Sequence, residues 1–259
     1  MMRAVRQISI PAGRPKDITP RPFSEFSDCA NIVLLGDPGA GKTHLFRESA
    51  AVEQARFITA RTFLNTPSDR LRGQALFIDG LDERRAGRGD RDTVDALIVK
   101  LFDVAPLKVR ISCRVADWLG ESDLAAMGTF FDQQNGAYVL HLDNLQRNEQ
   151  ITVLEEQDVG GDEVERFLNE AEERGLGDFL ENPQNLIMLW SAVKTGSWPA
   201  TRKQLFELST KLMLQEPNVE RARSGGGVFS VAELRLVAGA VCAARLISDV
   251  DAITHQSVI

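Results

Sequence analysis

The sequence has few cysteines and no long apolar run, and both shortages limit what the protein can be. Its three cysteines, at positions 29, 113 and 242, are an odd number without CxxC spacing. This argues against a disulfide framework and a zinc–cysteine cluster, and it fits a reducing compartment, so we expect a cytoplasmic protein. The first residues carry charge but no apolar signal segment. The longest apolar run, residues 236–244, is far shorter than the roughly 20 residues of a membrane helix.

Excess positive charge is also missing. Lysine and arginine number 30 against 37 acidic residues, which gives a formal net charge of −7. This balance argues against a protein that binds nucleic acid through a basic face, although it does not exclude a local basic groove. A hydrophobic fraction of 43% and a charged fraction of 26% are ordinary for a soluble chain, and 259 residues suffice for one large domain with a small appendage.

The first part of the chain predicts an α/β fold. Residues 1–30 contain four prolines and are expected to form an extended lead-in. Between residues 31 and 145, short apolar runs alternate with amphipathic stretches, as in a parallel sheet covered by helices. Strands are expected at 31–35, 56–59, 74–79, 107–113 and 137–142, with helices at 42–53 and 93–104.

After residue 145 the pattern changes, and no further strand is expected. The remaining residues, 146–259, predict an all-helical subdomain that is possibly truncated at its C-terminus. Its helices are expected at 146–157, 162–173, 184–193, 201–214 and 231–247.

A glycine-rich turn joins the first expected strand of the core to its first helix, and it matches GxxxxGK[ST] in full. Glycines let the backbone curl so that its N–H groups face a phosphate at the helix N-terminus. Lys42 is expected to reach the β- and γ-phosphates, and the Thr43 hydroxyl to bind Mg²⁺. His44, which comes next, is expected as a helix-surface side chain. The expected ATP-binding residues here are Gly36, Asp37, Pro38, Gly39, Ala40, Gly41, Lys42 and Thr43.

Carboxylates follow a second apolar strand, in the string ALFIDGLDE of residues 75–83. The strand brings Asp79 to the edge of the sheet where ligands bind, and Asp79 is expected to hold Mg²⁺ through water. Asp82 or Glu83 is expected to position and deprotonate the attacking water. Together with the preceding turn, this pattern predicts an ATPase, and the sequence leaves the choice between the two bases open.

Arginines supply the cations that such a site needs. Arg114 ends the strand at 107–113, and a strand lying between those that precede Gly36 and Asp79 would aim Arg114 at the γ-phosphate. There it would distinguish ATP from ADP. The charged segment 82–92 is either a solvated loop or a source of a cation for a neighbouring subunit's nucleotide. The sequence does not choose among Arg84, Arg85 and Arg88.

The string Asp79-Gly-Leu-Asp-Glu83 resembles the NACHT branch of STAND-class NTPases, signalling ATPases related to AAA+ proteins. Residues 111–114 (ISCR) look like the family's sensor strand. Residues 180–189 (LENPQNLIML) are similar to its asparagine–proline lid motif, and residues 201–206 to its next lid helix. The resemblance implies a five-stranded parallel sheet in the order 5-1-4-3-2, a helical lid, and Pro183 against the adenine. Pro183 as an ordinary first residue of a helix is the alternative.

Two departures from the family are visible. Its winged helix and its repeat-rich sensor are not seen, so the chain is either a fragment or a short member. The resemblance implies a slow ATPase whose nucleotide state controls conformation and self-association, in signalling for defence or regulation. Its effector is unknown. The alternatives are an AAA+ or helicase-like motor, and a module that binds nucleotide without hydrolysing it.

Overall fold

The structure is a computed structural model. It describes residues 3–11, 17–82, 90–134, 136–157, 159–195, 198–199, 201, 203–204, 207, 210 and 230–248. Contacts divide the chain into a first unit, Met1–Leu186, and a second unit, Ile187–Ile259. All features of the site described below lie in the first unit.

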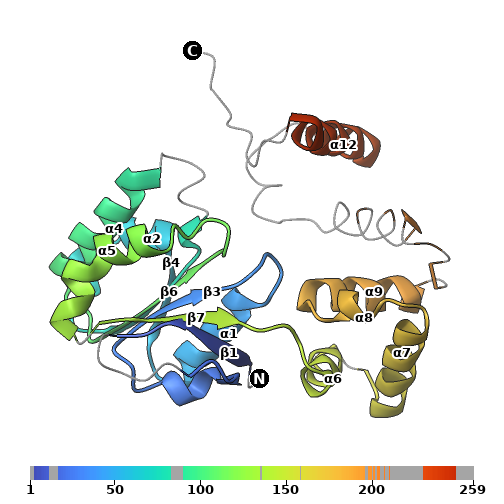
Figure 1. The fold of residues 1–259 in the computed structure, drawn as a ribbon, viewed down its shortest axis with the longest axis horizontal. Coiled ribbons are helices and arrows are strands. Elements are labelled where there is room, and N and C mark those ends of the chain that lie inside the picture. The colour runs from blue at the N-terminus through green and yellow to red at the C-terminus, as the bar shows by residue number, and fades with distance from the viewer. Residues whose placement is uncertain are drawn as a thin grey trace. The chain divides into compact units, whose positions relative to one another are not determined.

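A twisted seven-stranded sheet forms the centre of the first unit, in the order β2-β1-β7-β3-β6-β5-β4 (Figure 1). Five neighbouring strands, from β7 to β4, are parallel, whereas β1 and β2 are antiparallel. The strands are β1 (Ala4–Ser9), β2 (Arg21–Pro22), β3 (Asn31–Leu35), β4 (Arg56–Thr59), β5 (Ala75–Asp79), β6 (Lys108–Cys113) and β7 (Tyr138–Leu142).

The prediction of a purely parallel, five-stranded sheet is therefore wrong in strand number and direction. The five predicted strands do follow one another as 5-1-4-3-2 when numbered along the chain. The two additional strands come from the expected lead-in. Strand β1 pairs with β7 and alternates buried Val5 with exposed Arg6, and β2 has only two residues. Because β1 is half-polar and β2, at the edge of the sheet, is very short, neither has the continuous apolar run that marks the central strands.

Helices cover both faces of the sheet, and two apolar clusters fill the layers between. On one face, α1 (Lys42–Val52) buries Leu45 and Phe46 against Ile32 and Leu34 of β3. On the opposite face lie α2 (Ala60–Asn65), α4 (Asp90–Val104) and α5 (Glu121–Phe131) (Figure 1). The sequence analysis missed α2 and α5.

In the described residues after β7, all regular secondary structure is helical, as expected there. The first helices are α6 (Arg147–Glu155), α7 (Gly161–Glu173), the short α8 (Gly177–Leu180) and α9 (Pro183–Thr195), and α12 (Val231–Ser248) lies in the second unit. Most of the helix predicted at 201–214 lies outside the described residues. Within the described part of the chain, none of the helices has both the length and the apolar content needed to cross a membrane.

Candidate active site

The glycine-rich turn lies between β3, which is buried along its whole length, and α1. Its backbone takes positive φ angles at Gly39 (+76°) and Gly41 (+93°), where a side chain would strain the chain. Gly41 is the N-cap residue of α1 and makes no side-chain cap. The first N–H groups of α1 are thus not satisfied by their own cap residue, which suits an anion such as a phosphate.

Lys42 begins α1 and folds back over the turn. Its Nζ donates hydrogen bonds to the backbone oxygens of Gly36 (2.6 Å) and Asp37 (3.0 Å). Burial lowers the pKa of Lys42, whereas the negative charges of Asp82 and Asp79 act in the opposite direction. The Lys42 ammonium group therefore interacts electrostatically with Asp79 and Asp82, the two carboxylates that the sequence analysis placed in the site.

The two predicted magnesium ligands are in direct contact. The Thr43 hydroxyl donates a hydrogen bond to Asp79 Oδ2 at 2.7 Å. The other carboxylate oxygen, Oδ1, accepts one from the fully buried Ser112 hydroxyl at 2.5 Å, and Ser112 Oγ accepts one from Gly80 N–H. Asp79 is thereby fixed at the C-terminal end of β5. Hard oxygen donors of this kind fit Mg²⁺, so Thr43 and Asp79 are suited to hold it.

Asp82 and Arg114 form an ion pair at the same edge. Arg114 Nε lies 2.7 Å from Asp82 Oδ2, and the Asp82 side chain is 6% exposed whereas that of Arg114 is 46% exposed. The predicted position of the Arg114 strand is confirmed, since β6 lies between β3 and β5. Glu83 and the three arginines at 84, 85 and 88 lie outside the described residues.

The start of α9 packs directly against the glycine-rich turn. Asn182 donates a side-chain hydrogen bond to Pro38 O (3.0 Å), and the Gln184 N–H donates one to Gly39 O (3.3 Å). Pro183 is the first residue of α9, as one of the two interpretations expected. Asn182 Oδ1 caps the helix by accepting from the N–H groups of Gln184 and Asn185. The segment 182–184 therefore joins the post-sheet helices to the turn.

Arg3 makes a second connection, and the sequence analysis missed it. The side chain is 3% exposed, and its guanidinium donates to Ala40 O in the turn (3.2 Å) and to Asp143 O after β7 (2.6 Å). Its Nε lies 3.4 Å from Glu149 Oε1 on α6, a carboxylate that is also buried. One buried cation thus contacts the turn, the end of the sheet and the first helix that follows it.

Gly39 offers a direct test of the contact between α9 and the turn. A Cβ at this position would lie 2.4 Å from Gln184 Oε1 and 2.9 Å from Asn182 Oδ1. Gly73 also has a positive φ (+66°), but a Cβ there would have no neighbour within 4 Å. We expect Gly39→Ala to lower the free energy of unfolding by about 1–3 kcal/mol more than Gly73→Ala does. Urea denaturation measures both, and equal losses would show that the contact is not present in solution.

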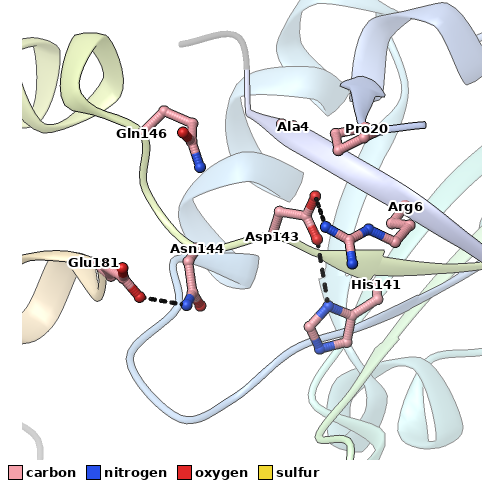
Figure 2. Close-up of a pocket in the computed structure, with 8 residues that line it drawn as sticks. All are labelled: Ala4, Arg6, Pro20, His141, Asp143, Asn144, Gln146 and Glu181. Atoms are coloured by element: carbon pink, nitrogen blue, oxygen red, sulfur yellow. Dashed lines mark hydrogen bonds and ion pairs between the residues drawn. The ribbon is translucent and has the colours of Figure 1, made fainter. Parts of the chain in front are cut away.

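A pocket of about 650 Å³ opens where the chain passes from β7 to α6 (Figure 2). Polar side chains dominate its wall. Asp143 contacts Arg6 (3.3 Å) and lies 3.9 Å from His141, and Asn144 donates a hydrogen bond to Glu181 (2.6 Å). The lining residues are Ala4, Arg6, Pro20, His141, Asp143, Asn144, Gln146 and Glu181. The connection between the sheet and the following helices therefore has one open, largely polar side, whereas Leu145 within it is buried.

The structure brings together most of the predicted site. Lys42, Thr43, Asp79, Asp82 and Arg114 meet at one edge of the sheet, as the preceding contacts show. Three participants were not singled out from the sequence: Arg3, Ser112 and Asn182. Ser112 and Asn182 lie within strings that resemble the family, so a signal for them existed. Arg3 directly precedes β1, a half-polar strand that no pattern marked.

No protein-family model and no curated protein matches this chain. Among solved structures, it is similar to the Thermotoga maritima RuvB Holliday junction branch migration motor. That match has 16% identity and a TM-score of 0.38, and it covers 81% of this chain and 74% of the other. A point variant of Thermotoga maritima RuvB gives 17% identity, a TM-score of 0.40, and coverage of 85% and 77%. At these scores, neither likeness carries information about function.

Proposed function

We propose that this chain binds and slowly hydrolyses ATP, and that it works as a signalling switch of the STAND/NACHT type. The observation that carries the proposal is the meeting of Lys42, Thr43, Asp79, Asp82 and Arg114 at the N-terminus of α1. In this proposal residues 31–145 form the nucleotide-binding core and residues 146–259 the helical lid. The ATP state favours self-association.

In this proposal, different groups in and around the turn bind the phosphates and Mg²⁺. Backbone N–H groups of the turn at 36–43, where Pro38 has none, and the Lys42 ammonium hold the phosphates, and the Thr43 hydroxyl and Asp79 hold Mg²⁺. When bound, Mg²⁺ neutralises charge on the phosphate oxygens. Ser112 keeps Asp79 oriented through its 2.5 Å hydrogen bond. Pro183, beside Gly41, is proposed to contact the adenine; a Cβ on Gly41 would lie 3.7 Å from its Cγ.

Hydrolysis requires a base that orients a water molecule in line with the γ-phosphate. Asp82 or Glu83 accepts a proton from that water as its oxygen attacks phosphorus, and the bond from phosphorus to the ADP oxygen breaks. Asp82 is held by Arg114 in this structure. Lys42 and Arg114 stabilise the negative charge that develops on the transferred group.

The ion pair between Arg114 and Asp82 suggests how ATP and ADP are distinguished. Nearly half of the Arg114 side chain is exposed, so it is able to turn from the buried Asp82 towards a γ-phosphate. ADP has no γ-phosphate to compete for it. Only a ligand with different affinities for two conformations shifts their populations. ATP would have such a difference in affinity, because its γ-phosphate interacts with Arg114 only after Arg114 has left Asp82.

The segment 182–184 carries the change to the lid, because it contacts the turn directly. An open pocket with mostly polar lining residues lies beside it. Arg3 contacts Ala40, Asp143 and Glu149. A movement of α6 therefore requires that Arg3 either breaks some of these contacts or moves with the helix.

Hydrogen exchange tests this switch. We expect ATP, but not ADP, to change the protection of residues 180–195, and Arg114→Ala to remove most of that difference while weakening ADP binding only modestly. The control is Arg174→Ala, which removes an exposed arginine from the end of α7. Identical exchange with ATP and ADP in the wild-type chain would indicate a passive nucleotide-binding module instead.

A further inference from the structure

A second group of potential metal ligands lies outside the phosphate site, on the surface where α1 meets α6. His44 and Glu48 lie one turn apart on α1, and Glu156 is the C-cap residue of α6. Among the described residues, these three form a group whose ligand atoms all lie within 4.8 Å of one another. We propose that they bind a divalent first-row transition-metal ion, of which Zn²⁺ is the representative.

The distances are close to those of a metal centre. His44 Nε2 lies 3.2 Å from Glu48 Oε1 and 3.8 Å from Glu156 Oε2. Ligand atoms about 2.0–2.2 Å from a tetrahedral zinc ion are roughly 3.3–3.6 Å apart. The pair on α1 is already close to this separation, whereas Glu156 has to move closer, since the three ligand atoms lie within 4.8 Å of one another. Its position at the end of a helix and its exposed side chain permit that movement.

The chemistry of the ligands selects the class of ion. Two carboxylates from separate helices converge on one imidazole nitrogen, and a neutral imidazole with a lone pair on that nitrogen is a strong ligand for zinc-like ions. Mg²⁺ and Ca²⁺ prefer oxygen ligands only. Because the three side chains are 37–53% exposed, the ion can enter from solvent and keep a water molecule as its fourth ligand.

The position of this group means that a bound metal ion would link two helices. His44 directly follows Thr43 in the chain, whereas Glu156 belongs to the first helix after the sheet. A metal ion bound by both helices therefore connects the start of α1 with α6. We expect it to raise the protection of residues 147–156 from hydrogen exchange.

Calorimetric titration with ZnCl₂ tests the site in the nucleotide-free, thiol-reduced full chain, with excess Mg²⁺ present to occupy the Thr43–Asp79 position. We expect about one zinc ion per chain, and an affinity at least tenfold lower in Glu156→Gln. Glu155→Gln, which removes the exposed neighbouring carboxylate, should leave the affinity unchanged. Zinc should protect residues 147–156 in the wild type but not in Glu156→Gln.

Two results would overturn the proposal. One is the absence of zinc binding by the wild-type chain. The other is equal zinc affinity in the wild type and Glu156→Gln, which would assign the ion to other ligands such as the cysteines. Glu156→Gln changes an exposed helix end, so its fold is readily checked by circular dichroism before the titration.

Discussion

Replacing Asp82 and Glu83 together by alanine is expected to lower the rate of ATP hydrolysis by about 10²- to 10⁴-fold, while Mg·ATP still binds. The rate falls because no carboxylate remains at this point to orient the water molecule and accept its proton. Binding persists because the phosphates and Mg²⁺ are assigned to the turn, Lys42, Thr43 and Asp79. Asp79→Ala, in contrast, is expected to weaken metal-dependent binding as well as turnover.

A matched control removes the same charge elsewhere. Asp162 and Glu163 are adjacent exposed acids in the first turn of α7, and their double alanine variant should hydrolyse ATP at the wild-type rate. Single-turnover measurements with saturating ATP separate chemistry from binding. A wild-type rate in the variant lacking Asp82 and Glu83 would place the base elsewhere.

An AAA+ motor would use the same residues, but its turnover should be stimulated by a polymer substrate.

Arg3→Ala is expected to lower the free energy of unfolding by about 3–5 kcal/mol. The physical reason is that the Glu149 carboxylate, only 6% exposed, would lose the buried cation beside it. Burial lowers the pKa of Arg3, and Glu149 and Asp143 oppose that effect, so the guanidinium depends on these partners. Two backbone oxygens, of Ala40 and Asp143, would also lose their hydrogen-bond donor.

Arg6→Ala is the control for this change. Arg6 lies on β1, shortly after Arg3, and contacts the Asp143 carboxylate, but it is half exposed, so its loss should cost less than about 1 kcal/mol. Urea denaturation of both variants gives the comparison. If Arg3→Ala does not fold, Arg3→Lys retains the charge and should show an intermediate loss. Equal stabilities of Arg3→Ala and Arg6→Ala would mean that the buried network contributes little.

The sequence predicted the central strands β3, β5 and β6 because they are buried on both faces. Strand β3 reads NIVLL and β5 reads ALFID, and each is bounded by a glycine. Buried strands of this kind need continuous apolar residues, so the pattern is strong. The turn at 36–43 was predictable for a different reason, since phosphate binding requires glycine, lysine and threonine at fixed spacing.

What the sequence did not predict depends on contacts between distant residues. Strand β1 is held by pairing with β7, more than 130 residues away, and its own alternation covers only a few positions. The contact of Asn182 with Pro38 spans 144 residues. The family resemblance pointed to the segment containing Pro183, but only the structure shows that Asn182 both caps α9 and binds the turn.

The central claim is that residues 36–43 bind the phosphates of ATP, and calorimetric titration of Mg·ATP into the wild type and Lys42→Ala tests it most directly. Arg47→Ala, which removes an exposed cation from the same helix, is the control. A charge-assisted contact with phosphate contributes about 1.5–3 kcal/mol, so Lys42→Ala should bind ATP roughly 10- to 100-fold more weakly, and Arg47→Ala should bind it as the wild type does. Equal ATP affinity in the wild type and a folded Lys42→Ala, or no binding by the wild type, would contradict the claim.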